Sequence, residues 1–222
     1  MKKLFLVFIL ISFFIGCATV DNQIQSSNNS ADSGENAYSN AIAYLGVNNY
    51  ELAEINFLKA LNKNYNVVGA YYYLGLIEYR KNNYKKSEEY LKKCLNLDDK
   101  VTDAHNTLGA IYARQKRYKE AIVEFKKVLQ DSSYLFPENA LYNLALIHYS
   151  LKEFDKSIEY CNKCLYIVPK SPAVYYLLAK NYYRKGNIGK TRIFLYEIIK
   201  IFPHNVWSSK AKLFLKQYHL DK

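Results

Sequence analysis

The sequence predicts an all-α protein: an α-solenoid of about five helix pairs with a capping helix at its C-terminal end. Half of the 222 residues are hydrophobic, while Pro and Gly, which interrupt helices, number only 4 and 8. Similar segments recur every 34 to 36 residues. Within each segment the apolar residues are three and four positions apart, which places them on one face of a helix. A repeat of this length is typical of stacked helical units that share a continuous core.

The second helix of each repeat, helix B, has a small residue near its start: Ala53, Ser87, Ala121, Ser157 and Thr191. The spacings between these residues are 34, 34, 36 and 34. A bulky or apolar residue follows four positions later, and another follows three positions after that. The two sets are Phe57, Leu91, Phe125, Cys161 and Leu195, and then Ala60, Cys94, Val128, Cys164 and Ile198. We expect these two columns to form the inner face of helix B.

The first helix of each repeat, helix A, carries a large residue next to a small one. The pairs are Leu74-Gly75, Leu108-Gly109, Leu144-Ala145 and Leu178-Ala179. A small side chain at this place lets a neighbouring helix approach closely. Polar pairs separate helix A from helix B, and a proline closes the fourth and the fifth unit. These residues are Asn48-Asn49, Asn82-Asn83 and Gly186-Asn187, and Pro169 and Pro203.

This pattern resembles the tetratricopeptide repeat (TPR), and the resemblance covers residues 36 to 203. It implies an array over 37–203 with repeats at 34–67, 68–101, 102–137, 138–171 and 172–205. The first repeat fits least well, because Asn40-Ala41 stand where Leu-Gly is expected. Residues 206–220 predict an amphipathic helix that covers the last repeat, as solenoid ends require. Its apolar residues are Trp207, Ala211, Leu213, Phe214, Leu215 and Tyr218.

The N-terminus predicts a signal peptide over residues 1–16. Lys2 and Lys3 precede an apolar stretch from Leu4 to Ile15. Twelve helical residues cover about 18 Å, which is too short for a hydrocarbon core of roughly 30 Å. The segment that ends in Gly16-Cys17 resembles the lipobox of bacterial lipoproteins, whose first residues here are Phe14 and Ile15. The alternatives are an ordinary cleaved signal with an incidental cysteine, or an uncleaved anchor.

The lipobox resemblance implies a covalent lipid on the Cys17 thiol, cleavage before Cys17 and an acyl chain on the new N-terminus. Two or three chains provide the stable anchoring that one chain does not. We expect no other cofactor. Because Ala18 follows Cys17, the resemblance favours the outer membrane of a bacterial envelope, facing the periplasm. Residues 17–36 then form the lipidated cysteine and a flexible tether, since the segment 21–36 is almost entirely polar.

Charge and motifs indicate neither nucleic-acid binding nor catalysis. The net charge is +11, but Lys and Arg are scattered among acidic residues with no basic run, as on solvated helix faces. Cys161 and Cys164 are in the apolar columns of helix B, so we expect packing cysteines and not a redox or zinc site. His105, His148, His204 and His219 are isolated, and the chain has no phosphate loop and no nucleophile elbow. We expect no enzyme, no metal and no small-molecule substrate.

The groove face of the A helices is the predicted binding site for a partner protein. Its residues are Tyr38, Ile42, Tyr72, Leu76, Tyr79, Arg80, Asn106, Arg114, Tyr142, Leu146, Tyr149, Tyr176, Lys180, Tyr183 and Arg184. Tyrosine offers a large contact area with a polar tip at a low cost in side-chain entropy. An apolar helix or an extended segment of a partner would fit this face. Alternatively, some of these tyrosines pack between adjacent A helices.

The junction between the third and fourth repeats, residues 128–144, has two extra residues. Asp131, Tyr134 and Pro137-Glu138, followed by Tyr142-Asn143-Leu144, resemble the corresponding junction of the type IV pilus biogenesis lipoproteins, the PilF/PilW pilotins. This resemblance implies an outer-membrane factor that escorts or stabilises the secretin subunits of the pilus exit pore. Two other functions remain open: an adaptor for cell-wall hydrolases, and a subunit of the outer-membrane β-barrel assembly machine.

Overall fold

The computed structural model describes residues 33–220, and this part of the chain contains helices and turns without a strand. A first helix covers residues 33–46. The helices that follow are α2 (Tyr50–Asn62), α3 (Val67–Arg80), α4 (Tyr84–Leu97), α5 (Thr102–Arg114), α6 (Tyr118–Gln130), α7 (Pro137–Ser150), α8 (Phe154–Ile167), α9 (Pro172–Arg184), α10 (Ile188–Ile201) and α11 (Val206–Gln217). The all-α prediction is confirmed.

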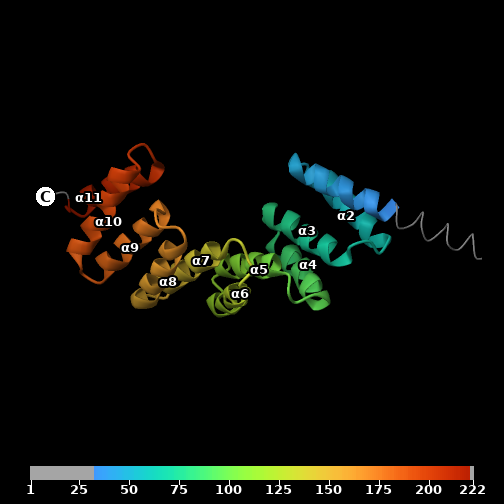
Figure 1. The fold of residues 1–222 in the computed structure, drawn as a ribbon, viewed down its shortest axis with the longest axis horizontal. Coiled ribbons are helices and arrows are strands. Elements are labelled where there is room, and N and C mark those ends of the chain that lie inside the picture. The colour runs from blue at the N-terminus through green and yellow to red at the C-terminus, as the bar shows by residue number, and fades with distance from the viewer. Residues whose placement is uncertain (1–32, 221–222) are drawn as a thin grey trace, which may run out of the picture. The chain divides into compact units, whose positions relative to one another are not determined.

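The chain forms two compact units that divide between Asp99 and Lys100. The first unit holds the helix of residues 33–46, α2, α3 and α4, and the second holds α5 to α11 (Figure 1). Within each unit the helices form consecutive pairs, in which helix A packs against the helix B that follows it. In the second unit α11 packs against α10 and α9, which is the place predicted for a capping helix.

The predicted inner face of helix B is buried in every pair. The small residues at its start, from Ala53 to Thr191, have no exposed surface, and neither do Phe57, Leu91, Phe125, Cys161 and Leu195. In two repeats the small residue is a serine whose hydroxyl donates to a carbonyl of helix A. Ser87 Oγ lies 2.6 Å from the Gly75 carbonyl oxygen, and Ser157 Oγ lies 2.8 Å from that of Ala145. Both hydrogen bonds satisfy a buried hydroxyl that would otherwise cost free energy.

Two glycines of helix A show how closely the paired helices approach. A Cβ atom added to Gly75 would lie 2.7 Å from Leu91 Cγ, and one added to Gly109 would lie 2.9 Å from the ring of Phe125. Carbon atoms in contact prefer about 3.5–4.0 Å, so neither position has room for a side chain. The predicted close approach at the small residues of helix A is confirmed.

The turns between helix A and helix B share one backbone conformation. A residue with positive φ occupies the same position of each turn: Asn48, Asn82, Lys116, Lys152 and Gly186. The next residue in each turn donates its N–H to the carbonyl five positions earlier, as in the hydrogen bond of 2.9 Å from Asn49 N to Tyr44 O. This pattern closes the helix C-terminus in a left-handed cap, for which Gly and Asn are the preferred residues. The predicted break at the Asn-Asn and Gly-Asn pairs has this physical origin.

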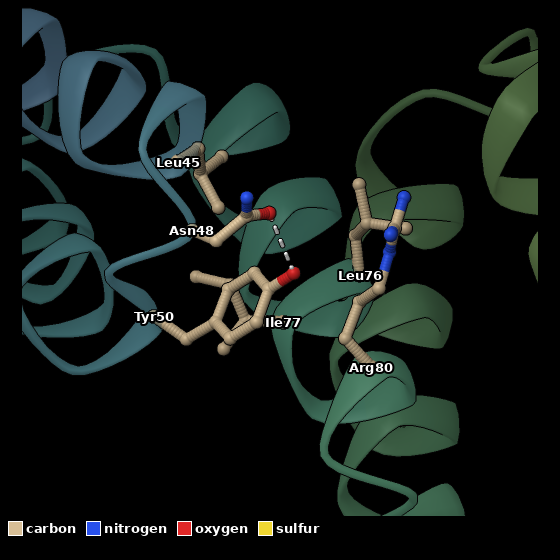
Figure 2. Close-up of a pocket in the computed structure, with 6 residues that line it drawn as sticks. All are labelled: Leu45, Asn48, Tyr50, Leu76, Ile77 and Arg80. Carbon is tan, nitrogen blue, oxygen red and sulfur yellow. Dashed lines mark hydrogen bonds between the residues drawn. The ribbon is translucent and has the colours of Figure 1, made fainter.

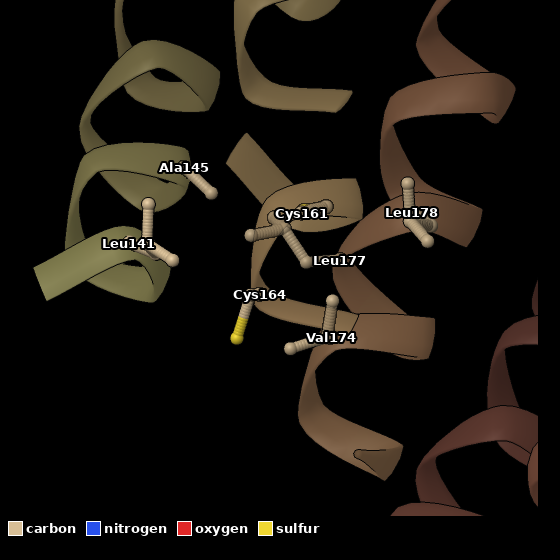
Figure 3. Close-up of a cluster of buried hydrophobic side chains, with 7 residues drawn as sticks. All are labelled: Leu141, Ala145, Cys161, Cys164, Val174, Leu177 and Leu178. Carbon is tan, nitrogen blue, oxygen red and sulfur yellow. The ribbon is translucent and has the colours of Figure 1, made fainter. Parts of the chain in front are cut away.

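The core of the second unit includes a cluster between α7, α8 and α9 (Figure 3). Cys161 and Cys164 belong to it together with Leu141, Val174 and Leu177. Both thiols are free and buried, and burial raises the pKa of Cys161 to about 12. A thiol that stays protonated near neutral pH is a poor nucleophile and metal ligand. The prediction of packing cysteines is confirmed.

Three features differ from the sequence-based expectations or lie beyond the structure. Residues 33–36, expected at the end of the tether, are helical, and Gly34 is buried against Lys63 and Tyr65. Leu213 of α11 is 64% exposed, whereas Ser208, Ala211, Phe214 and Leu215 form the buried face of that helix. The predicted signal peptide and Cys17 lie outside the described residues. None of the described helices is long and apolar enough to cross a membrane.

Candidate functional site: the groove face of the A helices

In the first unit, α3 presents four of the predicted groove residues: Tyr72, Leu76, Tyr79 and Arg80. Leu76 and the two tyrosines are half-buried, whereas Arg80 is exposed. The ring of Tyr72 lies 5.0 Å from that of Tyr73, and the ring of Tyr79 lies 5.9 Å from that of Tyr84. These neighbours limit the motion of the two rings. This face is therefore an apolar surface whose two rings already pack against neighbours, so their ordering on binding a partner costs less entropy. The positive charge of Arg80 lies at its end.

A small pocket of about 120 Å³ opens beside this face (Figure 2). It is lined by Leu45, Asn48, Tyr50, Leu76, Ile77 and Arg80. The hydroxyl of Tyr50 donates to Asn48 Oδ1 at 3.0 Å. This hydrogen bond ties the start of α2 to the turn before it. The pocket joins two predicted groove residues to a turn that the sequence did not associate with binding.

Two predicted groove residues, Tyr38 and Ile42, lie on the helix of residues 33–46 and differ in their surroundings. The ring of Tyr38 meets the rings of Phe57, Tyr65 and Tyr73 edge-on at 5.3 to 6.2 Å. Burial, with smaller contributions from Tyr73 and Tyr65, raises the pKa of Tyr38 to about 12. The ring of Tyr38 packs against the core of the first unit, and the side chain is half-buried. Ile42 is 37% exposed.

In the second unit, Tyr142, Leu146 and Tyr149 of α7 are half-buried and pack against the cluster in Figure 3. Burial raises the pKa of Tyr142, with smaller contributions from the cysteines of α8. Tyr149 remains the polar edge of this face. The Lys180 ammonium lies 4.4 Å from the centroid of its ring, in a cation–π contact. This contact holds a positive charge of α9 against an aromatic residue of α7.

Tyr176 and Tyr183 of α9 are covered by the capping helix. The ring of Tyr176 lies 5.6 Å from Trp207 and 6.1 Å from Phe214. The ring of Tyr183 lies 5.3 Å from Phe214 and 4.5 Å from Tyr218. Both tyrosines were expected to line the groove, but their rings fasten α11 to the last repeat. These two tyrosines are half-buried, and their ring contacts are with the capping segment and not with a neighbouring helix A.

Three arginines of the predicted groove share one position, the last turn of a helix A. Arg80 ends α3, Arg114 ends α5 and Arg184 ends α9, and all three are exposed. A cation near the C-terminus of a helix is stabilised by the helix dipole, typically by about 0.3–1 kcal/mol. Because the charges of Arg80 and Arg184 remain in solvent, these two arginines can attract acidic groups of a partner to the face beside them.

Comparison with known proteins identifies the repeat. The family model of the tetratricopeptide repeat matches residues 68–101, 102–132 and 138–171. These three segments of the chain match the tetratricopeptide repeat. No curated protein matches it by sequence. Repeats of this kind form scaffolds whose stacked helices offer extended surfaces to other proteins.

Several solved structures share the TPR fold of this chain. PilF of Pseudomonas aeruginosa is similar with a TM-score of 0.68 and 21% identity, over 87% of this chain and 95% of that one. PilW, a type IV pilus biogenesis factor, is similar with a TM-score of 0.65 and 17% identity, over 85% and 94%. YrrB, a TPR protein with an unusual peptide-binding site, gives 0.67 and 20%, over 79% and 90%. At these identities the similarity shows a shared fold.

A group of charged residues inside the first unit was not predicted from the sequence. The carboxylate of Glu78 is almost completely buried and accepts hydrogen bonds from Lys86 Nζ at 2.9 Å and Asn83 Nδ2 at 2.8 Å. Lys86 also donates to Glu54 at 2.9 Å, and Glu54 accepts a further bond from Lys81. One signal was present: Glu78 occupies the position that holds Tyr112, His148 and Tyr182 in later repeats. A carboxylate at a core position needs cationic or hydrogen-bonding partners.

The two buried histidines have structural partners. His148 stacks on Tyr160 with ring centroids 5.2 Å apart, and its Nδ1 lies 2.7 Å from Glu153. His105 Nδ1 lies 2.6 Å from Glu124. The predicted packing role of His148 is confirmed. Within residues 33–220, no group of three or more His, Cys, Asp or Glu side chains is placed to hold a metal ion.

The extended junction between α6 and α7 is tied to the start of α5. Asp131 accepts hydrogen bonds from the side chains of Thr102 and Ser133 and from Ser133 N, and these bonds lower its pKa. The hydroxyl of Tyr134 donates to Asp103 at 2.8 Å. The acidic and tyrosine residues of this junction therefore hold the loop in place. Leu135 and Phe136, which lie between it and α7, are exposed.

Proposed function

We propose that this TPR protein is a lipid-anchored scaffold of a bacterial envelope that binds a segment of a partner protein along the groove face of its A helices. One observation carries the binding proposal. On α3, the half-buried side chains of Tyr72, Leu76 and Tyr79 form an apolar face beside a pocket and the exposed Arg80. A partly preordered apolar face edged with positive charge suits an apolar protein segment with acidic neighbours.

The proposed anchor is the lipid on Cys17, and the proposed location is the outer membrane, facing the periplasm. Support comes from the lipobox-like residues Phe14 to Cys17 behind a short apolar stretch. Metabolic labelling with an alkyne-bearing fatty acid would test it. Wild type is expected to incorporate the label and to sediment with membranes, whereas Cys17→Ala should lose both properties. Equal labelling of the two proteins would disprove the assignment.

Within this function, a role like that of the pilotins in type IV pilus biogenesis is the more specific proposal. It is supported by the fold shared with PilF and PilW over nearly the whole length of both. The junction with Asp131 and Tyr134 adds to this support. The expected partner is then an outer-membrane secretin. Cell-wall hydrolases and subunits of the β-barrel assembly machine are the other partners that the experiment below would reveal.

A pull-down from detergent-solubilised membranes, read by mass spectrometry, tests the binding face and the partner together. Wild type is compared with a triple variant of the face, Tyr72→Ala, Leu76→Ala and Tyr79→Ala. The matched control, Lys85→Ala, Glu89→Ala and Asn96→Ala, changes exposed residues of the adjoining α4. Circular dichroism establishes that all three proteins remain helical.

A secretin retained by wild type and the control but lost by the face variant would support both the scaffold and the pilotin-like role. If hydrolases or barrel-assembly subunits are retained in this pattern, the scaffold stands and the pilus role falls. If the face variant retains every partner of wild type, the binding face is assigned wrongly.

A further inference from the structure

We propose that the pocket between the first helix pair and α3 is a recognition subsite for an aliphatic side chain of the partner that adjoins a carboxylate. This inference rests on the proposed scaffold function and specifies what one part of the surface recognises. The subsite combines an apolar floor with two hydrogen-bond donors at its rim. The donors are the guanidinium of Arg80 and the side-chain amide of Asn48.

The floor and walls of the pocket are apolar. Ile77 is fully buried beneath it, and Leu45 and Leu76 are half-buried on either side. Its volume of about 120 Å³ is close to the roughly 150 Å³ of an engineered cavity that holds benzene, so a single aliphatic side chain fits. Burial of such a side chain is favourable because apolar area leaves water.

The rim selects a negative charge. Arg80 makes no ion pair within the described part of the chain, so its guanidinium can form a bidentate contact with a carboxylate. Asn48 Oδ1 already accepts the hydrogen bond from the Tyr50 hydroxyl, which leaves Nδ2 to donate to a ligand. Figure 2 shows Arg80 and Leu76 across the pocket from Asn48 and Leu45. A carboxylate between Arg80 and Asn48 would satisfy donors from both sides.

The acidic residues nearby do not occupy this role. The carboxylates of Glu54 and Glu78 are both bound to Lys86, on the α4 side of α3. Glu51 lines a second, more open hollow on the other side of Tyr50, together with Val47 and Lys81. Because Glu51 would repel a carboxylate in that hollow, the charge is expected on the Arg80 side. Apolar continuation of the ligand can extend over Val47, which is exposed.

Nuclear magnetic resonance titration of the full-length chain in detergent micelles tests this subsite. The first probe is the acetylated peptide Gly-Ser-Gly-Ser-Leu with a free C-terminal carboxylate, and its matched control is the same peptide as an amide. The second probe carries the charge on a side chain, as the amidated peptide Gly-Ser-Leu-Asp-Gly-Ser, with Asn in place of Asp as its control. Comparing the two probes shows whether the carboxylate comes from a chain end or from a side chain.

At least one acidic probe is expected to shift the side-chain N–H signals of Arg80 and Asn48. It should bind about tenfold more tightly than its neutral control, which corresponds to about 1.4 kcal/mol. Arg80→Gln should remove this preference. Asn48→Gly, which keeps the positive φ of the turn but lacks the amide, should reduce it. Lys126→Gln, which removes one exposed positive charge from α6, should leave it unchanged.

Equal binding of acidic and neutral probes, or an unchanged preference in Arg80→Gln, would overturn the subsite. Shifts that appear only away from Arg80 and Asn48 would also overturn it. None of these outcomes affects the scaffold proposal, which depends on the capture of a partner through Tyr72, Leu76 and Tyr79. A failed pull-down together with a charge-selective pocket would refute that face and retain the subsite.

Discussion

Replacing Gly75 with alanine is expected to destabilise the protein, although alanine is the better helix former. The added Cβ would lie 2.7 Å from Leu91 Cγ and 2.8 Å from Leu91 Cδ2. Since carbon contacts prefer about 3.5–4.0 Å, one of the two helices must yield by most of an ångström. The position of Cγ depends on χ1, and few χ1 rotamers are open to a leucine inside a helix. Leu91 is also fully buried, so it cannot turn into solvent.

The magnitude follows from two opposing effects. Overpacking of a well-packed core costs about 1–3 kcal/mol. Exchange of glycine for alanine inside a helix returns up to about 1 kcal/mol. Because the contacts with Leu91 are as short as 2.7 Å, the overpacking cost is expected in the upper part of its range, and the free energy of unfolding of Gly75→Ala should be lower by about 1–2 kcal/mol. Gly189→Ala is the matched control, because a Cβ there meets only Asn187 Oδ1 at 3.8 Å. That variant should be more stable than wild type by up to about 1 kcal/mol.

Urea denaturation followed by circular dichroism measures both changes. The account predicts opposite shifts of the transition midpoint for the two variants, with unchanged m values. A Gly75→Ala protein as stable as wild type would refute the reasoning, because α3 and α4 would then have room to separate without loss.

Three further predictions concern turns, thiols and charges. Lys152→Gly should stabilise the protein by about 0.5–1 kcal/mol in thermal denaturation, because Lys152 has a φ of 62° in a left-handed turn that suits glycine better; a destabilised variant would contradict this. Burial raises the pKa of Cys161 to about 12, so its thiol should resist alkylation at pH 8 in the native protein and react in concentrated guanidinium. Peptide mapping by mass spectrometry measures the labelling. Rapid labelling of the native protein would contradict the burial of this thiol. Burial alone would raise the pKa of Glu54, but hydrogen bonds from Lys81 and Lys86 outweigh it and hold this pKa below 4.5. Glu54 should therefore stabilise the fold above about pH 4.5 and lose this effect as the pH falls further. The free energies of unfolding of wild type and Glu54→Gln, measured by urea denaturation at several pH values, should converge in acid. A difference that stays constant with pH would show that the charge has no such effect.

The repeat and its core could be predicted from the sequence because both depend on local, periodic information. The small residues Ala53 to Thr191 mark the same buried point of each helix B, and the turns break where Asn or Gly accepts a positive φ. Lys116 and Lys152 adopt the same φ without any such sequence signal. At these two turns the packing of the helix pair imposes a positive φ, although lysine prefers a negative one.

The exposure of individual groove residues could be predicted only in part. A period of 3.6 residues identifies the face of a helix, but it does not indicate which neighbour covers that face. Tyr183 has the helical position of a groove residue, yet Phe214 and Tyr218 pack against its ring, because α11 folds back over α9. The pocket at Arg80 was not predicted either, since Asn48 reaches it from a turn and Tyr50 from the start of α2.

Site-specific photo-crosslinking in the native cell tests the central claim most directly, namely that α3 binds a partner protein through its groove face. A photoreactive phenylalanine analogue replaces Leu76 on that face, and in a second protein it replaces Glu89 on the exposed face of α4. If α3 binds a partner in this way, position 76 should give one discrete crosslinked protein and position 89 should give none. Crosslinking from position 89 alone, or the same product from both positions, would contradict it.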